Sequence, residues 1–260
     1  MSKKVISMLN MALLPMAING CATPKPTPEQ MQAGAVWMFP GIFGGDWSLA
    51  EARRGFRDGD VEQAIYSFYW ERLTVVDFLP NLMDEPGNRE RVGRCAEAIT
   101  EYAQNYPDRP ISLVGYSGGV GVAIMAAEAL LAEVQLHNVL LVHRAISLDY
   151  DLTPALQRID GKLVNFYSSL DWLMLGVGTS IFGTADRRHT DTAGKVGFEL
   201  DKAVPELPDR EKVEQVPWQF ALFKNWHFGN HLNMIVYDWN KNVVAPYLKI
   251  SMASTGEPRP

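Results

Sequence analysis

The stretch Ile111-Ser-Leu-Val-Gly-Tyr-Ser-Gly-Gly-Val120 decides which fold we expect for this chain. Its first four residues, Ile111 to Val114, form a short apolar run that predicts a buried strand, and the alanine-rich stretch 120–134 predicts a helix. Between them stand Gly115, Ser117 and Gly119 in a Gly-x-Ser-x-Gly pattern. Glycines leave room for a tight strand-to-helix turn. We therefore expect Ser117 at the tip of a strained turn, where its hydroxyl is accessible for nucleophilic attack.

The rest of the chain alternates short apolar runs with amphipathic stretches, which favours an α/β fold with a mostly parallel central sheet flanked by helices. We expect further strands over residues 35–39, 64–69, 139–148, 162–167 and 212–216, and further helices over 87–106 and 241–249. The interval between Asp149 and Lys162 is too short for a large cap domain, so we expect an open site. Residues 173–210 are glycine-rich and then polar, and we expect a long excursion near the site.

A serine hydroxyl needs a base that takes its proton, so a histidine is expected downstream. Two candidates, His227 and His231, lie close together near the C-terminal end of the chain. In folds with this turn the histidine belongs to the loop that enters the last helix. This position favours His231, and it leaves His227 as the alternative base, a pocket residue or a hydrogen-bonded structural histidine. His137 and His143 are expected to be structural.

The histidine in turn needs a carboxylate that orients it and stabilises its charged form. Asp171 follows the predicted strand 162–167 after a short polar link, which is the position that the acid takes in this type of fold. Asp171 could instead cap a helix. Asp149 and Asp151, after the preceding strand, are the alternative acids.

Acyl transfer also requires two backbone N–H groups that stabilise the oxyanion. We expect one from Gly118, directly after the nucleophile, and the other from Ile42 or Phe43 in the glycine-rich loop after the first strand. Tyr116 and His189 are candidates for lining the pocket. The sequence shows no group of His, Cys and carboxylates with metal-ligand spacing, so we predict neither a metal site nor a cofactor.

The N-terminal residues predict export. Residues 1–20 combine Lys3 and Lys4 with a mostly apolar run that is too short to span a bilayer, which is typical of a signal peptide. Cys21 stands where cleavage would fall, so the segment resembles a lipoprotein signal, with Cys21 as the lipidation site and membrane anchor. Residues 21–32 predict a proline-rich linker, extended over Ala22 to Pro28, which leads to a domain over 33–252 and a tail over 253–260. We therefore expect a protein of the cell envelope.

Composition excludes some classes of function. The 260 residues include 47% hydrophobic and 21% charged residues, which is ordinary for a globular domain. The net charge of −6 and the lack of a basic cluster make nucleic acid a poor candidate partner. The second cysteine, Cys95, lies in a predicted helix and is expected to be a small structural residue.

The chain resembles the α/β-hydrolase superfamily of serine hydrolases over about residues 33–250. It is most similar to uncharacterised bacterial α/β-hydrolases of planctomycete type, in the stretches Phe39-Pro-Gly-Ile42, Leu113-Val-Gly-Tyr-Ser-Gly-Gly119, Phe166-Tyr-Ser-Ser-Leu-Asp171, Phe182-Gly-Thr-Ala-Asp186 and Ala245-Pro-Tyr-Leu248. A Gly-Gly-His-Phe-like stretch of that group corresponds to Gly229-Asn-His-Leu232, which also favours His231. Asn230 and Leu232 depart from that pattern.

The residues and the resemblance together imply a carboxylic ester or thioester hydrolase, esterase- or lipase-like, with Ser117, Asp171 and His231 as its triad. A small-molecule or lipid acyl substrate is expected. Two alternatives stay open at this point. The same triad could cleave amides or peptides, or the chain could be an envelope lipoprotein that keeps the fold as a non-catalytic binding scaffold.

Overall fold

The computed structural model describes residues 25–41, 46–68, 85–143, 146–171 and 196–250. Six strands form one sheet in the order β2-β1-β3-β4-β5-β6, and every neighbouring pair is parallel. The strands are β1 (Ala35–Phe39), β2 (Ala64–Ser67), β3 (Ile111–Tyr116), β4 (Leu136–Val142), β5 (Ile159–Tyr167) and β6 (Val213–Pro217). The predicted parallel sheet is confirmed, with each expected strand in place.

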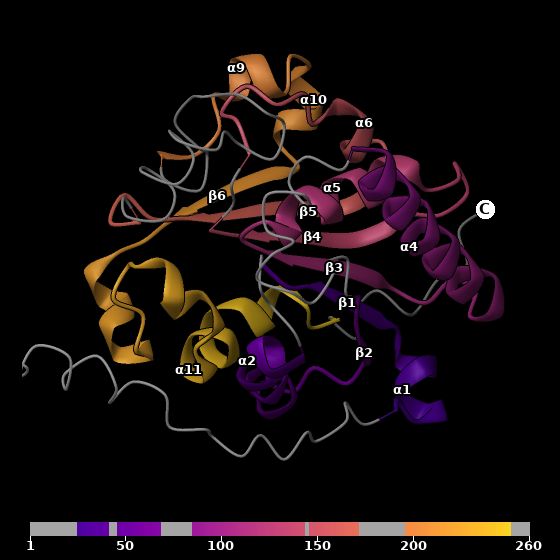
Figure 1. Ribbon diagram of the computed structural model, residues 1–260, viewed down its shortest axis with the longest axis horizontal. Coiled ribbons are helices and arrows are strands. Elements are labelled where there is room, and N and C mark those ends of the chain that lie inside the picture. Colours follow the sequence, from indigo (N-terminus) through magenta and orange to yellow (C-terminus); the bar gives the residue numbers. More distant parts are fainter. Residues whose placement is uncertain (1–24, 42–45, 69–84, 144–145, 172–195, 251–260) are drawn as a thin grey trace, which may run out of the picture.

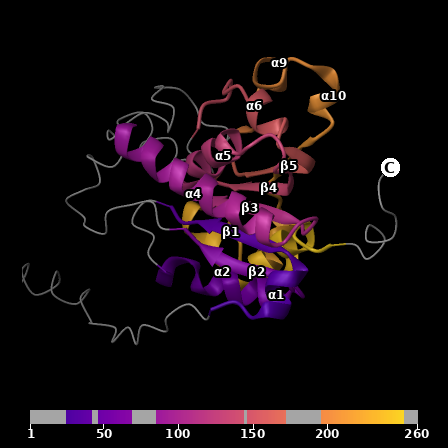
Figure 2. The same ribbon diagram turned by 90° about the vertical axis from the view of Figure 1, so that its right-hand side faces the viewer.

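Helices cover both faces of this sheet (Figures 1 and 2). The α-helices are α1 (Pro28–Ala33), α2 (Asp46–Asp58), α4 (Glu85–Asn105), α5 (Gly119–Ala129), α6 (Thr153–Leu156), α9 (Leu200–Ala203), α10 (Leu207–Arg210) and α11 (Tyr237–Trp239). Tighter or wider helical turns form η3 (Phe220–Asn225), η4 (His231–Ile235), η5 (Asn240–Val244) and η6 (Ala245–Tyr247). Among the described residues, none of these helices is both long and apolar enough to cross a membrane.

The alternation of side chains along the strands sorts the core into two halves. On β1, Trp37 and Phe39 join one apolar cluster with residues of α4, α5 and α6. Val36 and Met38 point to the other face and join a second cluster with residues of α2, α11 and η5. All five residues of β1 are buried, as expected for a strand covered on both faces. Figure 1 shows α4, α5 and α6 on one side of the sheet and α2 and α11 on the other.

The strand order reverses direction beside β1. The chain runs from β1 to its neighbour β2, and then returns to place β3 on the opposite side of β1. In open parallel sheets a crevice forms at the carboxyl ends of the strands where the order reverses, and ligands bind there. The glycine-containing turns after β1 and β3 therefore meet at the edge of the sheet that is suited to a binding site.

The last part of the proline-rich linker predicted over 21–32 is helical, since α1 begins at Pro28. Thr27 caps α1: its hydroxyl accepts from the amide of Gln30 at 3.3 Å, and the Gln30 side chain accepts from the amide of Thr27 at 3.0 Å. Proline is well tolerated in the first turn of a helix, where its missing N–H costs nothing. The reciprocal cap and Pro28 therefore start a helix inside a proline-rich stretch.

Three element boundaries also differ from the predictions. Helix α5 stops at Ala129 because Leu130 is extended (φ −65°, ψ 148°), which lets the chain turn back toward β4. Strand β4 stops at Val142, six residues earlier than predicted, because His143 has a positive φ of 49°. The closing helical region begins at Tyr237 rather than Lys241 and changes its winding through η5 and η6. The shorter β4 matters most, because it moves His143 from a strand interior to a strand end.

Cys95 is buried on α4, within the apolar cluster on the face of the sheet that α4, α5 and α6 cover. Burial raises the pKa of its thiol to about 12, so the thiol stays protonated at neutral pH. This placement agrees with the structural role expected for Cys95.

Candidate active site

Ser117 occupies a sharp turn between β3 and α5. Its φ is +52°, a left-handed conformation that a residue other than glycine rarely adopts. Its backbone N–H donates to the carbonyl of Val142 at 2.9 Å, which ties the turn to the end of β4. The chain packs tightly around this turn, since a Cβ atom on Gly119 would lie 2.4 Å from the carbonyl oxygens of Phe39 and Pro40. The local geometry is that of a strained strand-to-helix turn presenting a serine.

His231 joins Ser117 to Asp171. Its Nε2 lies 2.8 Å from the Ser117 Oγ, and its Nδ1 lies 2.7 Å from the Asp171 Oδ2. Asp171 is 1% exposed and His231 is 7% exposed, so the interaction between them is shielded from bulk water. The three side chains come from the turn after β3, the loop after β5 and the start of η4. Ser117, His231 and Asp171 thus form a continuous chain of hydrogen bonds, the arrangement that activation of a serine requires.

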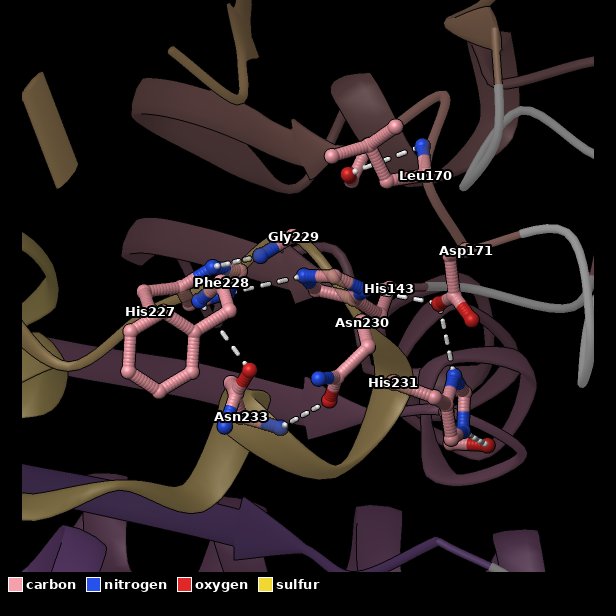
Figure 3. A network of polar contacts seen from close by, with 11 residues as sticks. His143, Leu170, Asp171, His227, Phe228, Gly229, Asn230, His231 and Asn233 are labelled. Atoms are coloured by element: carbon pink, nitrogen blue, oxygen red, sulfur yellow. Dashed lines mark hydrogen bonds and ion pairs between the residues drawn. The ribbon is translucent and has the colours of Figure 1, made fainter. Parts of the chain in front are cut away.

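The loop that carries His231 is held by its own polar groups. The Asn230 side chain accepts from the amide of Asn233 at 3.2 Å, which caps η4. The Asn233 side chain accepts in return from the amide of Phe228 at 3.0 Å. These contacts surround His231 on both sides in sequence (Figure 3). The His231 imidazole therefore approaches Ser117 from a short loop that is held by hydrogen bonds between its own residues.

Asp171 is the charged member of the cluster. Burial alone would raise its pKa, but hydrogen bonds from His143 and His231 outweigh burial and hold the pKa of this carboxyl below its usual value. Asp171 is therefore ionised at neutral pH. In this state the buried carboxylate accepts hydrogen bonds from both imidazoles.

His143 also contacts Asp171, although the sequence indicated only a structural role. Its Nδ1 lies 2.7 Å from the Asp171 Oδ2, the same oxygen that His231 approaches. Its Nε2 lies 3.1 Å from the Nε2 of His227 (Figure 3). The signal that sequence reasoning missed is the end of β4: a strand ending at Val142 places His143 at the carboxyl edge, where site residues gather.

The other candidate residues predicted for the site, Gly118, Tyr116 and His227, lie in different environments. Gly118 follows Ser117 and precedes the first turn of α5, where backbone N–H groups have no partner within the helix. Tyr116, a candidate pocket residue, is instead fully buried in the core, where its hydroxyl donates to Asn240 Oδ1 at 2.7 Å. The prediction that Tyr116 lines the pocket is therefore wrong. Tyr116 is still part of β3, and its side chain packs in the same apolar cluster as that of Val114. His227 is buried beside His143 rather than beside Ser117.

The two alternative acids, Asp149 and Asp151, interact with residues outside this cluster. Asp151 accepts a hydrogen bond from the amide of Thr153, the first residue of α6, at 2.9 Å. Asp149 lies close enough to Lys202 for its charge to act on that side chain. The candidates Ile42, Phe43, His189 and Cys21 lie outside the described residues. Their assignments remain predictions.

His143, Asp171 and His231 bring three possible metal-ligand atoms within 4.8 Å of one another. Each ring Nδ1, however, lies 2.7 Å from the same carboxylate oxygen. Two ligands of a tetrahedral zinc ion would stand about 3.3 Å apart, given metal–ligand distances of about 2.0–2.1 Å. The spacing is that of hydrogen bonds, so proton transfer accounts for this cluster better than a metal ion does.

Comparisons with known proteins reach only distant structures. No family model and no curated protein matches the chain. Among solved structures, it is similar to a dienelactone hydrolase-like promiscuous phosphotriesterase, P91, from metagenomic libraries (14% identity, 75% of this chain and 71% of that one, TM-score 0.45). It is also similar to Est1E from Butyrivibrio proteoclasticus (11%, 86% and 91%, TM-score 0.41). A third structure is a Trichoderma reesei cutinase with a phosphonate inhibitor (16%, 85% and 77%, TM-score 0.34).

These likenesses are too distant to support an argument about activity. The fold follows from the chain itself: an all-parallel six-stranded sheet, helices on both faces, and a serine in the turn between β3 and α5. Within this sheet the order of Ser117, Asp171 and His231 along the chain is that of nucleophile, acid and base in an α/β-hydrolase. The chain has the α/β-hydrolase fold.

Gly41 gives a direct test of the geometry around Ser117. A Cβ atom at Gly41 would stand 2.9 Å from the Ser117 Cβ and 3.4 Å from its Oγ. We expect Gly41→Ala to displace the serine and to lower kcat by at least about ten-fold, because small misplacements of reacting groups are costly. The measurement is steady-state hydrolysis of a p-nitrophenyl ester, with KM changing less than kcat.

Gly93→Ala is the matched control, because a Cβ atom there meets nothing within 4 Å. Gly93 lies inside α4, so this change should leave kcat at the wild-type value and raise the free energy of unfolding by up to about 1 kcal/mol. Wild-type kcat in Gly41→Ala would show that Ser117 is not held as described.

Proposed function

We propose that this chain is a serine hydrolase that cleaves carboxylic esters or thioesters through an acyl-enzyme. The observation that carries the proposal is the position of His231, 2.8 Å from the Ser117 Oγ and 2.7 Å from a buried carboxylate. A surface serine in a structural turn needs neither partner. A hydroxyl that must lose its proton needs both.

The reaction uses each group in turn. The Ser117 Oγ attacks the acyl carbon as His231 Nε2 accepts the hydroxyl proton, and Asp171 stabilises the imidazolium that results. The backbone N–H of Gly118 and that of Ile42 or Phe43 are the expected donors that stabilise the oxyanion. His231 then returns the proton to the leaving alcohol or thiol. Water, deprotonated by His231, attacks the acyl-enzyme and releases the acid and the free serine.

Substitutions of the two neighbouring histidines test the assignment of the base. We expect Ser117→Ala and His231→Ala each to lower kcat for a p-nitrophenyl ester by about 10⁴-fold or more, since triad members act as a unit. His227→Ala should retain measurable turnover, because His227 contacts His143 and not Ser117. The three variants are compared by steady-state kinetics at one pH.

The opposite ranking of His231→Ala and His227→Ala would overturn the assignment of the base. Absence of turnover in the folded wild-type protein, over a panel of esters and thioesters, would favour a non-catalytic binding scaffold. Turnover of amides but not of esters would favour an amidase on the same triad.

An exposed aromatic cluster next to the catalytic histidine supports an apolar acyl substrate. The rings contact one another in a continuous series, Trp218–Phe220–Phe223–Phe228–Trp226. Phe220 is 79% exposed, and Leu232, directly after His231, is 74% exposed. Large apolar side chains grouped on a surface commonly mark a binding site.

The charge of this segment supports the same proposal. Between Glu214 and Asp238 the chain carries a single charged residue, Lys224, although the whole chain has a net charge of −6. An apolar surface without carboxylates suits fatty acyl chains and the lipid–water boundary. We therefore favour a lipase-like esterase that takes substrates with apolar acyl groups.

Acyl length should reveal the contribution of this cluster. We expect Phe220→Ser to lower kcat/KM for a long-chain p-nitrophenyl ester by about five-fold, which corresponds to about 1 kcal/mol of lost apolar contact. The same variant should hydrolyse a short-chain ester at the wild-type rate. The control is Leu207→Ser on α10, which removes a side chain that is 71% exposed outside the cluster. Equal effects of Phe220→Ser on both esters would contradict this role.

We also propose that the protein is exported and anchored through a lipid on Cys21, which would bring the domain to its substrate. The support is the sequence of residues 1–28 alone, with its basic start, apolar run and proline-rich link. Metabolic labelling with palmitate should label the wild-type protein in the membrane fraction, and Cys21→Ser should remove the label. Equal labelling of Cys21→Ser would contradict the anchor.

A further inference from the structure

A second line of buried hydrogen bonds reaches Asp171 from the side opposite the nucleophile. Its members are His143, at the end of β4, and His227, in the loop after η3. Both side chains are 1% exposed. The triad mechanism uses neither of them. Two buried imidazoles at a candidate active site therefore need an explanation of their own.

The proton positions along this line follow from one backbone contact. The amide of Gly229 donates to Nδ1 of His227 at 3.2 Å, so this nitrogen carries no proton. A neutral imidazole then has its only N–H at Nε2, which points at the Nε2 of His143, 3.1 Å away. His143 must accept there, which leaves its proton on Nδ1. That Nδ1–H donates to the Asp171 Oδ2 at 2.7 Å.

Both rings are neutral at neutral pH, as this arrangement requires. Burial, with a smaller contribution from the neighbouring His143, lowers the pKa of His227 to about 3. Burial also lowers the pKa of His143, against the opposing effect of its hydrogen bond to Asp171. The charges that act on His143 come from Asp171 in the loop after β5 and from His231 in η4. Those that act on His227 come from His143 and Asp171.

We propose that His143, held in one tautomer by His227, is a positioning residue. It fixes the orientation of the Asp171 carboxylate and weakens the effect of that carboxylate's negative charge on His231. This proposal deepens the hydrolase function proposed above and rests on it. Two N–H donors, one from each side, converge on a single carboxylate oxygen, so the carboxyl group cannot rotate without breaking one of them. The donor from His143 also shares the negative charge that would otherwise act on His231 alone.

The backbone at His143 supports a functional role. A φ of +49° is unfavourable for histidine, and such strain persists mainly at sites where surrounding contacts impose it. The His143 amide donates to the carbonyl of Phe166 on β5 at 3.1 Å, which keeps the strained residue beside the strand that leads to Asp171. His227 is held in turn by the indole N–H of Trp218, which donates to its carbonyl at 3.0 Å. The ring of His227 packs on Trp239 with centroids 4.3 Å apart.

Two substitutions of His143 separate positioning from mere filling of space. Asparagine tolerates a positive φ, and its side-chain N–H₂ stands where the imidazole Nδ1–H stood, so His143→Asn keeps the donor to Asp171. His143→Ala removes that donor. We expect His143→Ala to lower kcat at least ten-fold with KM within two-fold.

His143→Asn should recover most of kcat. His137→Asn is the matched control, a histidine on the same strand β4 but outside this line of contacts, and it should match the wild type in kcat and KM. Equal loss in the Asn and Ala variants would overturn the proposal. So would a wild-type kcat in His143→Ala.

The tautomers can be measured in the wild-type protein, which covers the case in which the variants do not fold. Nitrogen-15 NMR of histidine-labelled protein at neutral pH should show His143 protonated at Nδ1 and His227 protonated at Nε2. Either ring in the other tautomer, or His143 doubly protonated, would overturn the proposal. This result does not depend on turnover, whereas a folded wild-type protein without turnover would contradict the hydrolase function instead.

Discussion

The bridge that His231 forms between Ser117 and Asp171 is the interaction that the rest of the site depends on. It spans 2.8 Å on one side and 2.7 Å on the other, so neither end tolerates a shift of an ångström. The parallel sheet makes the bridge possible, because β3 and β5 bring Ser117 and Asp171 to one edge. The loop that carries His231 must then fold back over this edge. Its short internal hydrogen bonds at Asn230 and Asn233 hold it there.

The backbone strain of this arrangement is concentrated at the residues that directly follow β3 and β4. Ser117 and His143 both have a positive φ, and they follow neighbouring parallel strands, β3 and β4. Backbone strain of this kind amounts to about 1–3 kcal/mol per residue. The amide of Ser117 donates to Val142 and that of His143 to Phe166, so each strained residue is tied to the strand beside it. The sheet thereby offsets the strain and sets the distances among the side chains at its edge.

Much of the fold could be predicted from the sequence because its signals are local. The apolar run Ile111 to Val114, the glycines around Ser117 and the helix that follows act over a few residues, and the structure shows them as expected. The positions of Asp171 and His231 after their respective elements also followed from chain order. The capping box at Thr27 is equally local, and it went unrecognised because the prolines around it favoured an extended reading.

The rest depends on contacts between distant parts of the chain. Apolar residues resume at Ala145 and Ile146 after the polar pair His143-Arg144, which made the predicted strand too long, although this pair follows the end of β4 directly. His143 contacts Asp171, 28 positions away, and His227, 84 positions away. Such pairings arise only when the strands are assembled. Tyr116 illustrates the same limit, since its burial depends on Asn240, 124 positions along the chain.

Reaction of the folded protein with a fluorophosphonate probe, followed by intact mass and peptide analysis, tests the central claim most directly. The account predicts one adduct per chain, located on Ser117, with no adduct in Ser117→Ala. An unlabelled wild-type protein, or an adduct that persists in Ser117→Ala, would contradict the claim that His231 and Asp171 activate this serine.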